Sequence, residues 1–114
     1  MTVIYKILNA SEWSRALAGD RFEGSAADRA DGFMHFSTAG QVAETARRHF
    51  RGQTGLVMLA VEAERLGSAL TWEASRGGAL FPHLYGALAC DLVIEARVVP
   101  QTAEGFAELG DRSP

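Results

Sequence analysis

Apolar and polar positions along the chain follow two spacings, and together they predict a mixed set of strands and helices. Strands are expected where β-forming residues alternate with polar ones or run together, over residues 3–8, 33–37, 56–61, 70–74 and 92–99. Helices are expected where apolar residues recur every 3.6 positions, over residues 12–18 and 39–50. Because these elements do not alternate as regular strand–helix–strand units, the pattern favours an α+β fold.

Three segments carry more detailed expectations. Residues 20–30 are polar and small, which predicts an irregular loop. Thr38 and Gln41 stand three positions apart and match a capping box, so Thr38 is the predicted N-cap of the helix that Gly52 ends. Residues 80–88 are interrupted by proline and glycine, and we expect an irregular segment there.

The strand expected over residues 92–99 alternates apolar and charged side chains. This alternation predicts one buried and one solvated face. The apolar set is Leu92, Ile94, Ala96 and Val98, against Glu95 and Arg97.

At 114 residues the chain is long enough for one domain, expected over residues 1–102 with a tail, 103–114, that holds a short helix. The net charge of -3, with acids and bases interspersed, predicts no extended nucleic-acid surface, although a local phosphate site is compatible with it. No apolar run reaches the roughly 18 residues of a membrane span and no signal peptide is evident, so a cytoplasmic protein is expected.

The cysteine and histidines give no sign of a metal site. Cys90 is a single cysteine next to small and apolar residues, typical of a buried structural thiol. The three histidines and this cysteine lack the spacings that hold zinc. His49 falls on the helix stripe near its C-terminus, where a structural role is expected.

The first stretch with candidate chemistry is Asp31-Gly-Phe-Met-His-Phe-Ser-Thr38. Side chains alternate along a strand, so His35 and Ser37 are expected on one face, and Met34 and Phe36 on the core face. A histidine there can bond a ligand hydroxyl or titrate near neutral pH. The alternative is a surface histidine followed by a serine at a helix start.

The second stretch is Trp72-Glu-Ala-Ser-Arg-Gly-Gly78. A carboxylate beside an indole can have a raised pKa, which suits Glu73 to general acid or base chemistry. Arg76 beside two glycines is suited to holding a phosphate or carboxylate. The alternative is a solvated turn with an ion pair at its rim.

The third stretch is Leu80-Phe-Pro-His-Leu-Tyr-Gly86. If it is extended, Phe81, His83 and Tyr85 fall on one side and form a ligand wall with rings to stack and polar tips to orient. The alternative is a turn in which His83 and Tyr85 bond backbone groups.

In this order the three stretches resemble a small bacterial and plant family known as domain of unknown function 952, and Ile4-Tyr-Lys-Ile7 and Trp13 fit it too. That family is grouped by fold with the ADP-ribosyltransferases and the RNA 2′-phosphotransferases. The resemblance implies a split antiparallel sheet with two main helices, cradling NAD or an ADP-ribose-like ligand.

In the transferases a strand that carries His-Gly-Ser or His-Gly-Thr leads into a helix. His35-Phe36-Ser37 resembles that motif, with Phe36 in place of the glycine. The resemblance implies that His35 and Ser37 contact the adenosine ribose or the nicotinamide end of the ligand.

The leading hypothesis is an ADP-ribosyltransferase-like domain whose cleft takes a nucleotide or another phosphorylated small molecule. The residues expected to line this cleft are His35, Ser37, Glu73, Arg76, His83 and Tyr85. As a transferase of ADP-ribosyl or phosphoryl type, it would use His35 on a ribose hydroxyl, Arg76 on phosphate, and Glu73 as acid or base.

The alternative is a non-catalytic binding or interaction domain on the same fold. Two features of the sequence favour it. Phe36 replaces the glycine, and Glu73 precedes Tyr85, whereas the transferases place their tyrosine before their glutamate.

Overall fold

The computed structural model describes residues 1–99, except for the side chain of Arg76. A four-stranded antiparallel sheet has the order β4-β1-β5-β9, formed by β1 (Val3–Asn9), β4 (Ser37–Thr38), β5 (Leu56–Glu62) and β9 (Val93–Val98). A three-stranded antiparallel sheet has the order β3-β7-β6, formed by β3 (Met34–His35), β6 (Leu70–Ala74) and β7 (Leu80–Leu84). A short two-stranded pair joins β2 (Arg21–Phe22) to β8 (Leu88–Ala89).

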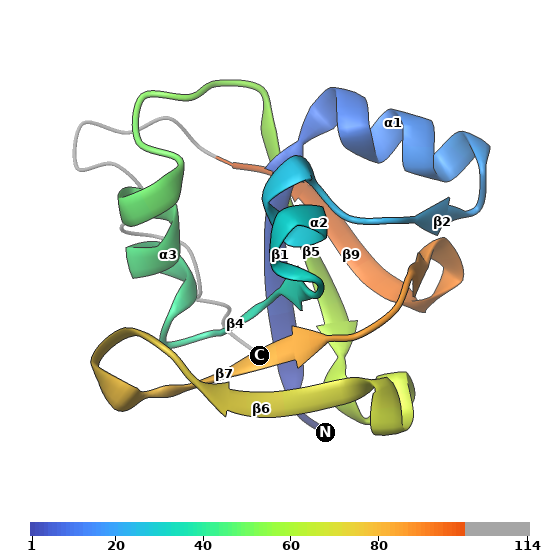
Figure 1. Ribbon diagram of the computed structural model, residues 1–114. Helices are drawn as coiled ribbons and strands as arrows, with labels where there is room; N and C mark the ends of the chain where they lie inside the picture. The colour runs from blue at the N-terminus through green and yellow to red at the C-terminus, as the bar shows by residue number, and fades with distance from the viewer. Residues whose placement is uncertain (100–114) are drawn as a thin grey trace.

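Three α-helices and three short 3-10 segments connect these strands. The helices are α1 (Ala10–Ala18), α2 (Ala26–Asp31) and α3 (Val42–His49), and the 3-10 segments are η1 (Ala63–Ala69), η2 (Arg76–Gly78) and η3 (Cys90–Leu92). Figure 1 shows α1 and α3 on opposite sides of the four-stranded sheet, with the β6–β7 hairpin across its lower end. The chain is therefore a small mixed domain of antiparallel sheets and a few helices.

Strand β5 lies in the centre of the fold because both of its faces are apolar. Leu59 and Val61 pack with Met34, Phe36 and other residues between the two sheets. Met58 and Ala60 pack on the opposite face in the cluster that includes Val42 and Ala46 of α3. The apolar run 56–61 is thus buried on both faces, as the sequence predicts for a central strand.

Local signals place α1 correctly. The Asn9 side chain accepts a hydrogen bond from Ser11 N, and the Glu12 carboxylate accepts one from Asn9 N, which completes a capping box. Gly19 caps the C-terminus, and its N–H donates to the carbonyl of Ala16. The predicted strands over residues 3–8 and 70–74 are also confirmed.

The prediction of an irregular loop over residues 20–30 is wrong. Strand β2 and helix α2 lie in that range, and α2 has its own capping box between Ser25 and Asp28. Residues 80–88 are more regular than predicted, since β7 is the middle strand of its sheet. Pro82 is accommodated there, and its carbonyl accepts a hydrogen bond from Phe36 N.

The strand predicted over residues 33–37 divides at Phe36. Met34 and His35 pair with β7, whereas Ser37 and Thr38 pair with β1 in the other sheet. The predicted helix start at Thr38 is wrong, because α3 begins after Gln41. The Gln41 side chain still reaches back and accepts a hydrogen bond from Thr38 N, so half of the expected capping box is present.

The solvated face of β9 is the opposite of the predicted one. Ile94 is 47% exposed and Val98 is 77% exposed, whereas Glu95 and Arg97 are half-buried. Val98 lies opposite Val57, and both side chains point to the α1 side of the sheet. On that side, the packed residues cover Val57 but leave Val98 exposed. The alternation of apolar and charged residues identified the strand. Which of its two faces is buried depends on where the helices pack.

The helix predicted within the tail, and residues 103–114 as a whole, lie outside the described residues.

Candidate functional site

One face of the β3-β7-β6 sheet gathers most of the residues with candidate chemistry. His35 lies directly opposite His83, and His83 lies directly opposite Thr71. Because side chains alternate along each strand, Glu73 and Tyr85 fall on this same face. The sheet register therefore brings together motifs that are about 50 residues apart in the chain.

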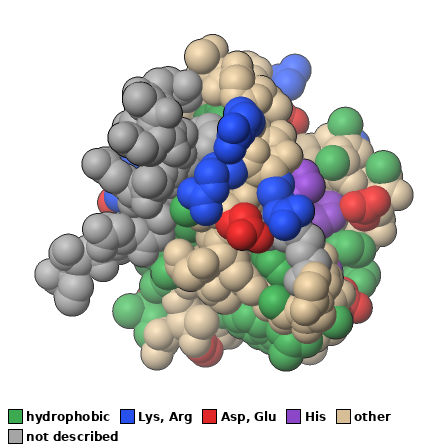
Figure 2. All heavy atoms as spheres, turned by 90° about the vertical axis from the view of Figure 1, so that its left-hand side faces the viewer, with side chains coloured by type: hydrophobic (Ala, Val, Ile, Leu, Met, Phe, Trp, Pro, Cys, Tyr) green, Lys and Arg blue, Asp and Glu red, His purple; other side chains and the backbone are tan. Residues whose placement is uncertain are grey.

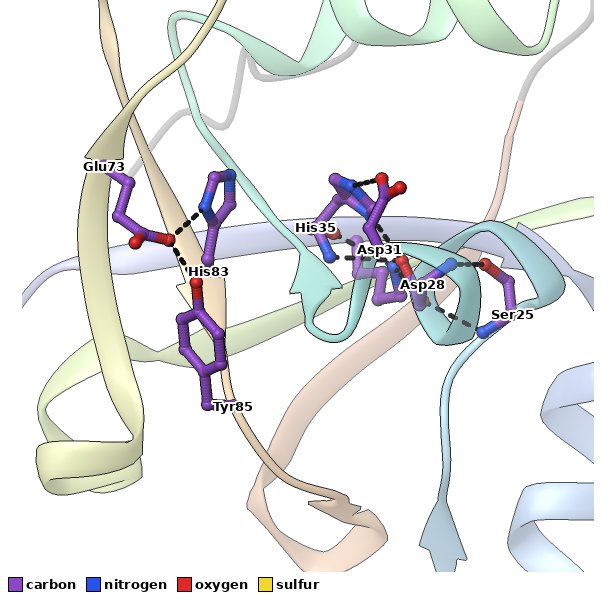
Figure 3. A network of polar contacts seen from close by, with 8 residues as sticks. Ser25, Asp28, Asp31, His35, Glu73, His83 and Tyr85 are labelled. Carbon is purple, nitrogen blue, oxygen red and sulfur yellow. Dashed lines mark hydrogen bonds and ion pairs between the residues drawn. The ribbon is translucent and has the colours of Figure 1, made fainter.

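Glu73 forms a polar group with two neighbours on β7 (Figure 3). Its Oε1 accepts hydrogen bonds from His83 Nδ1 and from the Tyr85 hydroxyl, each at 2.7 Å. His83 is buried, while the Glu73 and Tyr85 side chains are 38% and 46% exposed. Since the carboxylate fixes the proton on Nδ1, Nε2 carries the lone pair. Nε2 has no hydrogen-bond partner among residues 1–99.

The pKa of Glu73 is lowered, whereas the sequence analysis expected it to be raised. The hydrogen bond from His83, and then that from Tyr85, lowers its pKa below the ordinary value. The same bond raises the pKa of the Tyr85 hydroxyl, because Glu73 accepts its proton in a hydrogen bond. Trp72 points to the other face of β6, so it supplies no apolar surroundings for the carboxylate. Glu73 is an ionised carboxylate that orients His83.

Phe33 stands at the centre of the rings on this face. It stacks on His83 with the ring centroids 4.1 Å apart, and it lies 4.8 Å from His35 and 5.3 Å from Tyr85. The two histidine rings are edge to face at 5.8 Å. We call Phe33, His35, His83 and Tyr85 the ring cluster. It offers both an aromatic surface and two imidazoles at close range.

Asp28 of α2 holds the second histidine (Figure 3). Its Oδ1 accepts hydrogen bonds from the His35 ring at Nδ1 (2.6 Å) and from its backbone N (3.2 Å). Its Oδ2 accepts from Ser25 N (2.9 Å) and forms an ion pair with Lys6 Nζ (2.8 Å). The carboxylate is 4% exposed, and its bonds saturate it. Asp28 thereby joins α2, β1 and β3.

Asp28 and the charged residues around it alter one another's pKa values. Burial alone would raise the pKa of Asp28, but hydrogen bonds from His35 and the charge of Lys6 outweigh it and lower the pKa. For Lys6, burial is the larger effect, so its pKa is lowered despite the attraction of Asp28. Lys6 Nζ also donates to the His35 carbonyl at 3.0 Å.

His35 is held between two carboxylates. Nδ1 bonds Asp28, and Nε2 lies 2.8 Å from Oδ2 of Asp31, the last residue of α2. The hydrogen bond to Asp28 is the main cause of a raised His35 pKa, with Asp31 adding to it. The Asp31 side chain is 53% exposed, so this second bond is open to solvent and to a ligand. His35 therefore holds its proton at pH values where an ordinary histidine is losing it.

A surface hollow of about 310 Å³ lies on the α2 side of the ring cluster. Phe33 and Asp28 line it, together with Glu23, Arg29 and the backbone of Gly86. Glu73, His83 and Tyr85 do not line it. Phe33 belongs to both the hollow and the ring cluster, so the two surfaces meet at its ring.

Two of the predicted site residues are placed apart from this face or are not described. Ser37 is 3% exposed, and its hydroxyl shares a 2.9 Å hydrogen bond with that of Thr45 on α3. The chain changes sheets at Phe36, which removes Ser37 from the face of His35 and corrects the prediction that they share one. Arg76 begins η2 between β6 and β7, and its side chain lies outside the described part.

Sequence reasoning brought together His35, Glu73, His83 and Tyr85 but missed Asp28, Lys6 and Phe33 as members of the site. The signal for Asp28 was available, because Ser25 and Asp28 have the spacing of a capping box. Lys6 had a weaker signal as a charged residue inside an apolar strand.

Within residues 1–99, no group of three or more histidine, cysteine or acidic residues is arranged to hold a metal ion. Cys90 is half-buried, and its thiol donates to the Ala16 carbonyl at 3.4 Å. In the same part of the chain, no helix combines the length and apolar character needed to cross a membrane.

The fold and this face define a small mixed α/β domain with a histidine–carboxylate cluster on its smaller sheet. Residues 7–96 match the family model described as "Protein of unknown function (DUF952)", so the chain belongs to that family. This confirms the family resemblance found in the sequence.

Solved structures of an uncharacterised protein, CC0527 from Caulobacter crescentus, are similar to this chain. One crystal structure is 56% identical, with 92% of each chain covered and a TM-score of 0.89. A crystal structure of its double methionine mutant is 55% identical with the same coverage and TM-score. The solution NMR structure is 57% identical, covers 97% of this chain and 96% of that one, and has a TM-score of 0.85. No curated protein matches the chain.

Proposed function

We propose that the ring cluster binds a nucleotide or another phosphorylated small molecule and that the chain transfers a glycosyl or phosphoryl group from it. The observation that carries this proposal is the pair of carboxylate-bonded histidines with ring centroids 5.8 Å apart. One histidine is bonded by one carboxylate and the other by two. Two titratable groups with such different surroundings suit the opposite roles of acid and base.

His83 has the features of the base. Glu73 holds Nδ1, which leaves the lone pair of Nε2 to accept a proton from an acceptor hydroxyl or water. As that O–H bond breaks, its oxygen forms a bond to the carbon or phosphorus of the group being transferred. Glu73 acts through His83 by holding it in one tautomer and stabilising its protonated form.

His35 has the features of the acid. Its raised pKa favours the protonated form, and in that form its Nε2 proton is shared with the half-exposed Asp31. A ligand oxygen that displaces Asp31 would receive this proton as its bond to the transferred group breaks. The leaving group then departs with a proton and with both electrons of the broken bond, so the exchange is balanced.

The surroundings also fit the proposed ligand class. The rings of Phe33 and Tyr85 offer a surface on which a planar base can stack. On the face that carries α3, histidine side chains lie beside a group of Lys and Arg side chains (Figure 2). Arg47, in the last turn of α3, is a candidate partner for a phosphate, as Arg76 is in the sequence-based hypothesis, whereas the neighbouring Arg48 already forms an ion pair with Glu44 at 3.3 Å.

The ADP-ribosyltransferase-like fold is part of this proposal. Support comes from the two larger antiparallel sheets, with His35 on the three-stranded one beside a chain that continues into α3. NAD and ADP-ribose are therefore the first ligands to test. Ser37 is not part of the proposed contact surface, because it is buried against Thr45.

Binding is tested by thermal shift with NAD, ADP-ribose and a 2′-phosphorylated oligonucleotide. A ligand at 100 times its dissociation constant stabilises the folded chain by about 2.7 kcal/mol. His83→Ala and His35→Ala should weaken the shift or abolish it. If none of the three ligands shifts the wild-type protein, the nucleotide-site proposal is wrong.

Turnover is tested on whichever ligand binds. Glu73→Gln should lower the rate by about 10²- to 10⁴-fold while binding persists, because the His83 tautomer is no longer fixed. Glu64→Gln is the matched control, since Glu64 is also an exposed carboxylate that accepts a hydrogen bond, from Thr2 N at 2.9 Å. An equal rate in both variants would remove Glu73 from the chemistry.

A second candidate function is ligand binding without turnover on the same face. It is favoured by one observation, namely that both ring nitrogens of His35 are already engaged by carboxylates. Tight binding with no product from any bound ligand, in wild type and Glu73→Gln alike, would establish this function and exclude the transferase.

A further inference from the structure

The surface hollow beside α2 has no part in the proposed function. Its volume of about 310 Å³ lies at the small end of the range for small-molecule sites, roughly 300–1,000 Å³. A ligand of suitable size is one ring with a single substituent. Of the four residues in the ring cluster, only Phe33 lines the hollow. The hollow therefore offers a ligand a second surface, apart from His83 and Tyr85.

Apolar residues and glycines form much of the lining of this hollow. Met34 and Leu84, which lie opposite each other on β3 and β7, line it and are each 2% exposed. The aromatic Phe33 lines it too. Gly32 and Gly86 bring no side chains, and a Cβ at either position would meet no atom within 4 Å. The two glycines leave the hollow open, so its apolar lining is accessible to a flat apolar group.

Three charged residues line the hollow, and two of them already have partners of opposite charge. Asp28 forms an ion pair with Lys6 at 2.8 Å and is 4% exposed. Glu23 forms an ion pair with Arg21 at 3.0 Å. Arg29 forms no ion pair with another residue in the range 1–99. Within the described chain, its positive charge is therefore the unbalanced one in the lining, and it favours an anionic group on the ligand.

The guanidinium group of Arg29 is already oriented by a hydrogen bond. One terminal nitrogen, Nη1, donates to the Gly24 carbonyl at 2.7 Å. Nε and Nη2 have no hydrogen-bond partner among residues 1–99. Because one nitrogen is fixed, the side chain loses less conformational freedom when the other two bind a ligand. Its planar fork matches the oxygens of a carboxylate or a phosphate.

We propose that the hollow binds a small molecule that combines a flat apolar body with a carboxylate or phosphate group. The apolar body contacts the lining that Phe33, Met34 and Leu84 provide, and the exposed Arg29 binds the anionic group. This site is distinct from the reacting histidines of the proposed function, so each proposal can fail without the other.

NMR titration of the full chain tests binding with three probes that share one ring. Benzoate carries a carboxylate, phenyl phosphate carries a phosphate, and benzyl alcohol carries no charge. At least one anionic probe should shift the backbone amide signals of Gly32, Gly86 and Ala87 saturably, with a dissociation constant of roughly 1 mM for a molecule of this size. Benzyl alcohol should bind at least about fivefold more weakly, because it gives Arg29 no anionic partner. The tighter anionic probe identifies the group that the hollow takes.

Two variants separate the role of Arg29 from that of the space itself. Arg29→Gln should weaken binding of the anionic probes at least about fivefold and leave that of benzyl alcohol unchanged. Ala87→Trp should abolish binding of all three probes, because Ala87 is exposed in the lining and an indole there would fill the hollow. The amide spectrum of each variant shows whether it is folded.

Arg15→Gln is the matched control. Arg15 is likewise an exposed arginine in the last turn of a helix, α1, and it does not line the hollow. This variant should bind the probes as the wild type does.

If neither anionic probe shifts the three amide signals saturably, the hollow is not such a site. The same conclusion follows if benzyl alcohol binds as tightly as the anionic probes, or if Arg29→Gln or Ala87→Trp binds those probes as tightly as the wild type. Shifts centred on His83 and Tyr85 would place the probes in the ring cluster and overturn the proposal as well.

Discussion

The two histidine–carboxylate pairs in the ring cluster have the same chemical groups and opposite surroundings. Asp28 is almost fully buried and is bonded by His35, Lys6 and Ser25, whereas Glu73 is 38% exposed and, within the described residues, is bonded only by His83 and Tyr85. Removing a partner from a buried carboxylate whose hydrogen bonds are all made is strongly destabilising, whereas an exposed carboxylate can change its partners around a ligand. The Asp28 pair is therefore the framework of this face, and the Glu73 pair is the part that we propose to be reactive.

The largest effect should come from Asp28→Ala, which would break this comparison at its buried side. The change leaves the Lys6 ammonium buried without its partner, and the expected loss is about 3–5 kcal/mol in the free energy of unfolding. Urea denaturation measures it. Asp31→Ala is the matched control, because Asp31 also bonds His35 but is half exposed, and it should cost far less. Equal losses in the two variants would contradict the division between framework and reactive part.

A smaller, pH-dependent effect should follow from His35→Gln. The folded-state pKa of His35 is raised by Asp28 and Asp31, so its stabilising contribution is complete below its unfolded value of about 6.5. The contribution is lost as pH rises through the folded-state pKa. The stability difference between wild type and His35→Gln should therefore be largest at mildly acidic pH and shrink in alkaline solution.

Denaturation of both proteins across pH, with an NMR titration of the His35 ring, checks this dependence. Asp28 acts in the opposite direction, since its lowered pKa gives stability that is lost only as the pH falls well into the acid range. A difference that grows with rising pH would show that the Asp28 bond does not hold the imidazolium form.

The smallest expected effect is at the exposed pair. Glu73→Gln should return the pKa of Tyr85 toward its ordinary value, because the anionic acceptor that raises it is gone. Ultraviolet titration of the phenols follows this change, and Tyr85→Phe identifies which of the two tyrosines titrates. The midpoint of urea denaturation should shift less than in Asp28→Ala. An unchanged Tyr85 pKa would mean that the Glu73–Tyr85 bond is not held in solution.

The site could be predicted in part because the sequence patterns report the near neighbours of each residue. Alternation placed Phe81, His83 and Tyr85 on one side of a strand. The register of β7 confirms this for Phe81 and His83, and the bond of the Tyr85 hydroxyl to Glu73 places Tyr85 on that side too. The pKa of Glu73 was predicted in the wrong direction, because the prediction considered only the neighbouring Trp72. Its partners come from a different strand, β7, and pairing between strands is not encoded in local spacing.

The fold shows the same division. Local signals found α1, β1 and β5, since a cap or an apolar run acts within a few residues. They failed at residues 33–37, where the chain passes from one sheet to the other at Phe36. They also failed at β9, where the covering helices, and not the alternation, decide which face is solvated.

The sequence by itself therefore determined the family, the main strands, and the residue types available for chemistry. Only the tertiary structure decided that Asp28 and Lys6 are buried beneath His35. It also decided that Ser37 points toward α3 and that Glu73 forms a hydrogen bond with His83. The physical reason is that periodicity reflects contacts over two to four residues. Burial, ion pairing and pKa depend on segments that meet only after folding.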